Sequence, residues 1–177
     1  KWYLEPVDEA NFYFRYMFAN ANENSYITLG SGYKMYRETL NDWHYAIDIT
    51  GKTSFIRGTP IFSPTSGTVI YSDENEGSGI YVVIETDKCI KGTGQKVVLT
   101  FAHMIEKSPL EVGQRILPKK FIGYVGSTGN STGDHLHHAV FKSAPGSNTI
   151  YESDINCINP QRFYPNVPFA GGTSTAP

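Results

Sequence analysis

The chain has 177 residues, enough for one domain with its own hydrophobic core, and its formal net charge of -2 argues against the basic surface of a nucleic-acid-binding protein. Hydrophobic residues make up 40%, aromatic residues 14% and charged residues 18% of the sequence, and with 17 glycines and 10 prolines this composition favours β-strands joined by many turns. No apolar run approaches the roughly 20 residues of a membrane span, and the first residues lack the features of a signal peptide. Neither nucleic acid nor a membrane is therefore expected as a partner.

We expect a single domain, residues 1–177, in three parts. Residues 1–32 are expected to brace an edge of the main body, residues 33–165. Four aromatic side chains in the first part alternate as in a half-buried strand, and a row facing a substrate is the alternative to core packing: Phe12, Phe14, Tyr16 and Phe18. Residues 166–177 are expected to form a flexible tail or a linker to another module, because residues 171–177 are small and polar.

Short β-like runs follow one another through the main body, separated by glycine- and proline-containing turns. The runs cover residues 43–49, 61–62, 68–71, 80–84, 97–101 and 136–141. No long amphipathic helix with caps is evident. The pattern predicts an all-β, mainly antiparallel fold, a twisted sheet or sandwich with few or short helices.

The five histidines are concentrated in three short segments. His135 and His137 flank Leu136, and because strand side chains alternate, both should face one side of a strand while Leu136 enters the core and His138 faces the other side.

His44 and Asp48 are four residues apart and share a face on either a strand or a helix. Their β-branched and aromatic neighbours favour a strand, with Tyr45 and Ile47 in the core. Such a pair is often only a surface ion pair. The fifth histidine, His103, ends an apolar run, where a structural role is the alternative to a catalytic one.

Together these residues have the composition of a catalytic zinc site. Such a site needs three protein ligands and one open position for water. His44, Asp48 and either His135 or His137 would complete it. The remaining histidine of that pair and His103 would then be available for proton transfer and for stabilising an oxyanion.

The order His-x-x-x-Asp, aromatic-x-His and Gly-x-His-Leu-His resembles the lysostaphin-like, LytM-type zinc endopeptidases that cut bacterial peptidoglycan. The likeness includes residues 58–63, 66–69 and 121–129, and it covers roughly residues 33–165. It implies one zinc ion held by three ligands in a groove of a twisted antiparallel sheet, a pair of catalytic histidines, and peptidoglycan stem or cross-bridge peptides as substrates. The implied ligands are His44, Asp48 and His137, and the implied catalytic pair is His103 and His135.

Three departures from the family pattern bear on the site. Ala46 stands where glycine is usual, Phe101 replaces a common tyrosine, and His138 replaces a common phenylalanine. None removes a ligand or a catalytic histidine. A non-catalytic cell-wall-binding or hydrolase-activating module is the alternative to an enzyme, and members of that kind typically lack ligands.

The resemblance implies that the protein acts outside the cytoplasm, at the cell wall or as part of a phage virion. A secreted autolysin, a bacteriocin and a phage tail module or endolysin all fit. The bond that is cut should depend on the loops around residues 20–40, 72–80, 105–120 and 143–156. In an extracellular setting Cys89 and Cys157 could pair, and two separate thiols are the equal alternative.

Overall fold

The computed structural model describes residues 25–27, 32–51, 57–90, 93–142, 152–164 and 170–171. Strands form nearly all of the regular structure in these residues, and the described helical structure is a single 3-10 helix, η1 (Pro160–Phe163). The strands are β1 (Ser25–Ile27), β2 (Met35–Arg37), β3 (Asp42–His44), β4 (Ile47–Gly51), β5 (Pro60–Phe62), β6 (Gly67–Asn75), β7 (Gly79–Cys89), β8 (Lys96–Met104), β9 (Arg115–Ile116), β10 (Phe121–Tyr124), β11 (Leu136–Lys142), β12 (Cys157–Ile158) and β13 (Ala170–Gly171).

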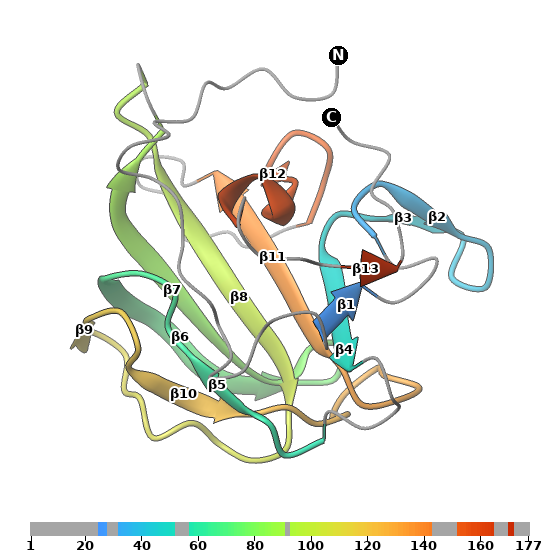
Figure 1. Cartoon of the computed structure of the whole chain (residues 1–177), viewed down its shortest axis with the longest axis horizontal. Coiled ribbons are helices and arrows are strands. Elements are labelled where there is room, and N and C mark those ends of the chain that lie inside the picture. Colours follow the sequence, from blue (N-terminus) through green and yellow to red (C-terminus); the bar gives the residue numbers. More distant parts are fainter. Residues whose placement is uncertain are drawn as a thin grey trace.

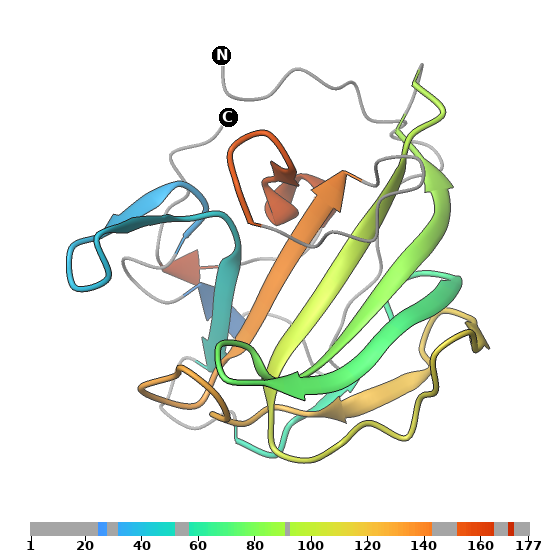
Figure 2. The same ribbon diagram turned by 180° about the vertical axis from the view of Figure 1, so that it is seen from behind.

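The main sheet has 9 strands and is built around three long ones, β7, β8 and β11. Its order is β13-β1-β4-β11-β8-β7-β6-β9, with β12 added beside β11. All its neighbours are antiparallel except β1 and β13. The strands twist strongly, so that β6 curls across the end of the sheet (Figures 1 and 2). The predicted fold class, mainly antiparallel all-β with few helices, is confirmed.

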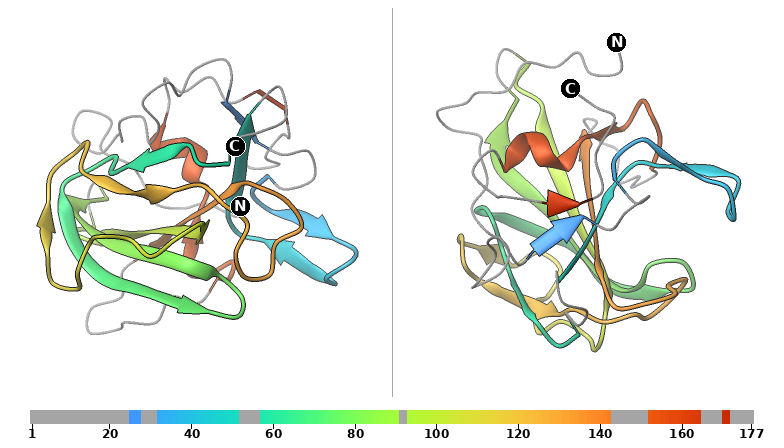
Figure 3. Two further views of the ribbon diagram at one scale, coloured as in Figure 1. Left: turned by 90° about the horizontal axis from the view of Figure 1, so that it is seen from below. Right: turned by 45° about the vertical axis from the view of Figure 1, so that its right-hand side comes forward.

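Two small sheets flank the main one. β5 and β10 form an antiparallel pair near the lower end of β8 in Figure 1, and β2 and β3 form a hairpin that projects beyond β4 (Figures 1 and 3). The β2–β3 hairpin carries the exposed Trp43, which packs edge-on against Tyr36 with ring centroids 5.2 Å apart.

The hydrophobic core lies along β7, β8 and β11. Every residue of β8 after Lys96 is buried, because the strand lies between β7 and β11 and is covered on both faces. This explains why its sequence is a continuous apolar run rather than an alternating one. Ile84, Leu99 and Val140 have no exposed surface, and their burial helps to hold β8 and β11, which carry histidines, beside β7.

The strand predicted over residues 43–49 is wrong in one respect, since the chain bends at Tyr45 and Ala46 between β3 and β4. The cause is a change of partner: β3 pairs with β2, whereas β4 pairs with β1 and β11. Ile47 is fully buried as expected, and Tyr45 packs partly buried against the core.

The described residues test only some of the remaining expectations. The alternating aromatics Phe12, Phe14, Tyr16 and Phe18 lie outside them. Cys89 and Cys157 are free thiols, the second of them buried. Within the described part of the chain, no helix has the length and apolar character needed to cross a membrane.

Candidate metal centre

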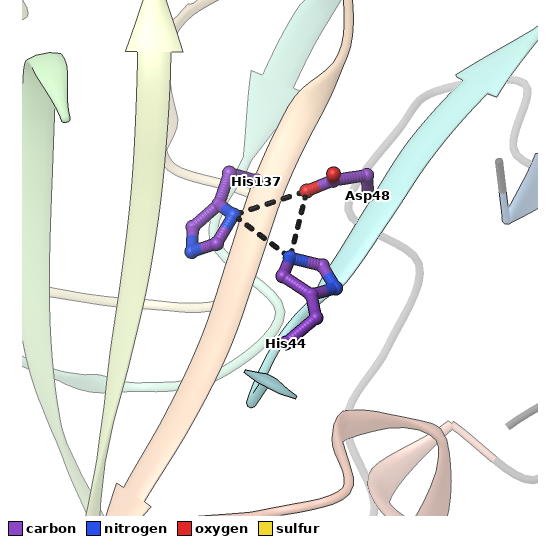
Figure 4. A group of neighbouring side chains, drawn as sticks. All are labelled: His44, Asp48 and His137. Atoms are coloured by element: carbon purple, nitrogen blue, oxygen red, sulfur yellow. Dashed lines mark hydrogen bonds and ion pairs between the residues drawn. The ribbon is translucent and has the colours of Figure 1, made fainter. Parts of the chain in front are cut away.

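Three side chains from neighbouring strands converge at the β4–β11 boundary. Asp48 of β4 lies directly opposite His137 of β11 in the antiparallel register, so both side chains leave the same face of the sheet. His44, at the end of β3, reaches the same point from the other side of the bend. Figure 4 shows the three groups pointing toward one another.

Their spacing matches the edges of a metal-centred tetrahedron. The Nε2 atom of His44 is 3.4 Å from the Nδ1 atom of His137 and 3.4 Å from Oδ1 of Asp48, and the last two atoms are 3.0 Å apart. Tetrahedral zinc with bonds of about 2.0–2.1 Å would place its ligand atoms about 3.3–3.4 Å from one another. Two imidazoles and a carboxylate are also a donor set that suits zinc. The residues therefore fit the metal that the sequence suggested.

In both His44 and His137, the ring nitrogen that points away from the cluster makes a hydrogen bond. This bond keeps the other ring nitrogen directed toward the cluster. The Nδ1–H of His44 donates to the carbonyl oxygen of Gly32 at 3.3 Å, which leaves Nε2 for a metal. The Nε2–H of His137 donates to Oε1 of Glu152 at 2.6 Å, which leaves Nδ1 for a metal. The two histidines thus offer different ring nitrogens to one point.

The cluster has an electrostatic preference for a cation. Burial would lower the pKa of His137, but the charges and hydrogen bonds of Glu152 and Asp48 outweigh it and raise this pKa to about 10. Burial would raise the pKa of Asp48, but the hydrogen bonds and charges of His137 and His44 hold it well below its usual range. A metal ion would take the place of the proton that His137 otherwise carries.

His103 reaches the site through a β-bulge. β8 has one residue more than β7 between the pairs Val82–Phe101 and Ile80–Met104, and His103 adopts a left-handed backbone with φ of 63°. Non-glycine residues rarely adopt this conformation, and strained conformations of this kind cluster at functional sites. The extra residue turns the His103 side chain toward the face used by His137, whose ring centroid is 5.6 Å away.

A tightly packed loop orients the His103 ring. Its Nδ1–H donates to the carbonyl oxygen of Thr128 at 2.7 Å, and the Thr128 hydroxyl donates to the Met104 carbonyl at 2.6 Å. The loop lies against the start of β7 through two glycines with positive φ. A Cβ atom on Gly129 would lie 2.2 Å from the backbone nitrogen of Gly79, so only glycine permits this approach.

His135 completes a second pair of imidazoles beside the metal ligands. Its ring centroid lies 4.8 Å from that of His103, and its Nε2 is 3.6 Å from Oδ1 of Asp48. Its Nδ1–H donates to the carbonyl oxygen of Gly133 at 2.7 Å. In both His103 and His135 a carbonyl thus accepts from Nδ1, and the Nε2 lone pair remains for chemistry.

Burial sets the charge of His103. Together with the neighbouring His137 and His135, it lowers the pKa of His103 to about 4. The ring is therefore neutral at pH 7 and able to accept a proton.

The centre lies at the edge of a groove of about 640 Å³. His137 and Glu152 line it together with the β2–β3 hairpin and the turn between β6 and β7, which contribute Arg37, Trp43 and Ser78. Three of the four loops expected at the groove contribute residues to it. The segment 105–120 contributes none.

The sequence pointed to five site residues, and the structure brings all five into one cluster: His44, Asp48, His103, His135 and His137. His138 faces the opposite side of β11, as expected from alternation, and is fully buried. Glu152 was not singled out from the sequence. It lies in a loop without periodicity or motif, so only its place in the fold reveals it.

Comparison with known proteins gave a family and several relatives. The model of Peptidase family M23 matches residues 42–149. The DD-carboxypeptidase/endopeptidase Mpg of Neisseria meningitidis is 32% identical over 109 residues, covering 60% of this chain and 22% of that protein. The peptidoglycan DD-endopeptidase ShyA of Vibrio cholerae is 31% identical over 81 residues, covering 46% of this chain and 17% of that protein. The chain thus spans about a fifth of the length of these two relatives.

A solved structure shows the same fold. The catalytic domain of the antimicrobial peptidase lysostaphin from Staphylococcus simulans superposes with a TM-score of 0.56 and 21% identity, over 87% of this chain and 92% of that domain.

Proposed function

The chain belongs to peptidase family M23, and from this premise we propose that it is a zinc-dependent endopeptidase that hydrolyses peptide bonds in peptidoglycan stem or cross-bridge peptides. The observation that carries the proposal is the spacing of three ligand atoms at 3.0–3.4 Å beside two further histidines. The named activity of the peptidoglycan endopeptidase relative supports the substrate class.

In this proposal His44, Asp48 and His137 would hold the zinc ion. Bound zinc would supply a water whose pKa falls to about 7, a source of hydroxide at neutral pH. Three protein ligands would leave the fourth position of a tetrahedral zinc ion for that water, as a catalytic zinc site requires.

His103 and His135 would manage the protons. Each presents an Nε2 lone pair, because its Nδ1–H is held by a backbone carbonyl. One ring would accept the proton of the attacking water, and a ring that has gained a proton can donate it to the leaving amine nitrogen. The bulge at His103 and the loop at Thr128 would serve to keep the rings in place for this transfer.

Residues 33–165 would be the catalytic core of a single domain. Since peptidoglycan lies outside the cytoplasm, we propose that the chain acts at the cell wall. A secreted autolysin, a bacteriocin and a phage tail module would all use the same site chemistry.

The test is release of soluble muropeptides from purified sacculi of defined chemotype, followed by mass spectrometry. We expect fragments with new peptide ends, loss of release in chelator, and recovery on addition of zinc. Cleavage that persists in chelator would contradict the metal role. Wall binding without any fragment release would favour a binding or activating module.

A further inference from the structure

We propose that Glu152 is a positioning residue for the metal centre: its carboxylate fixes the ring of His137 so that Nδ1 faces the metal. The inference rests on the proposed zinc site. It adds a residue that neither the histidine motifs nor the His–x–x–x–Asp spacing identifies.

The contact is short and points away from the metal face. Oε1 of Glu152 accepts a hydrogen bond from Nε2 of His137 at 2.6 Å, while Nδ1 of the same ring lies 3.0 Å from Asp48. The two nitrogens of an imidazole point in different directions, so Glu152 cannot share the position of a metal held at Nδ1. A carboxylate that accepts from the outer nitrogen of a metal-bound histidine sets both the tautomer and the ring orientation, and it raises the basicity of the ligand.

Glu152 is also a charged group, unlike the backbone carbonyl that accepts from the other histidine ligand. The outer nitrogen of His44, Nδ1, has the neutral carbonyl of Gly32 as its partner among the described residues, at the longer distance of 3.3 Å. The hydrogen bond from His137 to a carboxylate is the stronger kind. The side chain of Glu152 is one third exposed, and it lines the groove.

The backbone after Glu152 is anchored, which holds the carboxylate in place. The amide of Cys157 donates to the carbonyl of Ser153 at 3.0 Å, closing a turn that leads directly into β12 on the edge of β11. Tyr33 donates its hydroxyl to the Cys157 carbonyl at 3.0 Å. Asp154 lies in the same turn, but its side chain is half exposed, so its ion pair with Lys34 at 2.6 Å contributes little to this anchoring. The turn therefore connects the positioning carboxylate to the same strand that carries His137.

The test compares zinc affinity in Glu152→Ala and Glu152→Gln with the wild-type chain, by competition against a chromophoric chelator. Asp154→Asn is the matched control, because it removes a negative charge from the same turn without touching His137. We expect affinity to fall about 10- to 100-fold in Glu152→Ala. It should fall less in Glu152→Gln, which keeps an oxygen acceptor, and stay within about twofold of wild type in Asp154→Asn.

A spectroscopic measurement separates positioning from general damage to the fold. In the zinc-loaded wild type, the Nε2 proton of His137 should give a downfield NMR signal in slow exchange with water, and this signal should vanish by fast exchange in Glu152→Ala. Unchanged zinc affinity in both Glu152 variants would overturn the proposal even if wild type binds zinc. A wild-type chain without zinc affinity would instead refute the proposed function. If Glu152→Ala does not fold, Glu152→Gln decides the outcome.

Discussion

The clearest quantitative prediction concerns His138, the buried neighbour of the metal ligand His137. Its ring has no exposed surface and is held at both nitrogens. Nδ1 is 3.0 Å from the carbonyl oxygen of Thr100, and Nε2 is 2.9 Å from the hydroxyl of Tyr164. The carbonyl can only accept, so Nδ1 carries the proton and Nε2 accepts from the tyrosine. The site is built for a neutral imidazole.

The size of the effect follows from the pKa of His138. Burial lowers it from 6.5 to about 3, despite the hydrogen bond to Thr100. Between these two values the unfolded chain binds a proton that the folded chain refuses, so stability falls as the pH falls. A pH of 4 is 2.5 units below the ordinary histidine pKa of 6.5, which applies to the unfolded chain. The free energy of unfolding is therefore about 3 kcal/mol lower at pH 4 than at pH 7.

The assay is urea unfolding of the wild type and of His138→Phe at several values between pH 7 and pH 4. The variant loses two hydrogen bonds and should be less stable at pH 7, by about 1–3 kcal/mol. Its stability should nevertheless fall by about 3 kcal/mol less than that of the wild type on acidification. Zinc release and the titration of all other groups affect both proteins, so the difference isolates His138. Equal pH dependence in the two proteins would refute the reasoning.

Three further predictions concern the site and the loop that supports it. His103→Ala and His135→Ala should each lower turnover by about 10²-fold or more while retaining zinc by metal analysis, and loss of zinc from either would reassign it as a ligand. Gly129→Ala should cost about 1–3 kcal/mol in unfolding measurements, because its φ is 74° and its Cβ would meet a backbone nitrogen of β7 at 2.2 Å. Gly133→Ala is the control, since nothing lies within 4 Å of a Cβ there. Zinc binding at pH 7 should release about one proton, measured by calorimetry in buffers of different ionisation enthalpy, because the pKa of His137 is raised to about 10 without metal. Below that pKa, affinity should fall about tenfold for each pH unit, and a pH-independent affinity would contradict this.

Strand alternation was sufficient to predict which side chains share a face at the start of β11 and in the residue before it. Leu136 is fully buried, His135 and His137 face the site, and His138 faces the core on the other side. This result needs only the period of two that every strand has. The same rule predicted that His44 and Asp48 project together; they do meet, but across the bend between β3 and β4 rather than along one continuous strand.

Features that depend on tertiary pairing could not be read from the sequence. The bend between β3 and β4 exists because the two strands have different partners. The bulge that turns His103 toward the site depends on the register of β8 against β7. Glu152 meets His137 only because β12 brings its turn to β11. Each of these requires the sheet order, which local patterns do not contain.

The central claim is tested most directly by measuring the hydrolysis rate of sacculi against the amount of zinc bound to each chain. The zinc-free chain should be inactive, the rate should rise in proportion to bound zinc and level off at one ion per chain, and Asp48→Ala should neither bind zinc tightly nor gain activity. A zinc-free chain that hydrolyses peptidoglycan at the full rate, or an Asp48→Ala variant that binds and works like the wild type, would contradict the account.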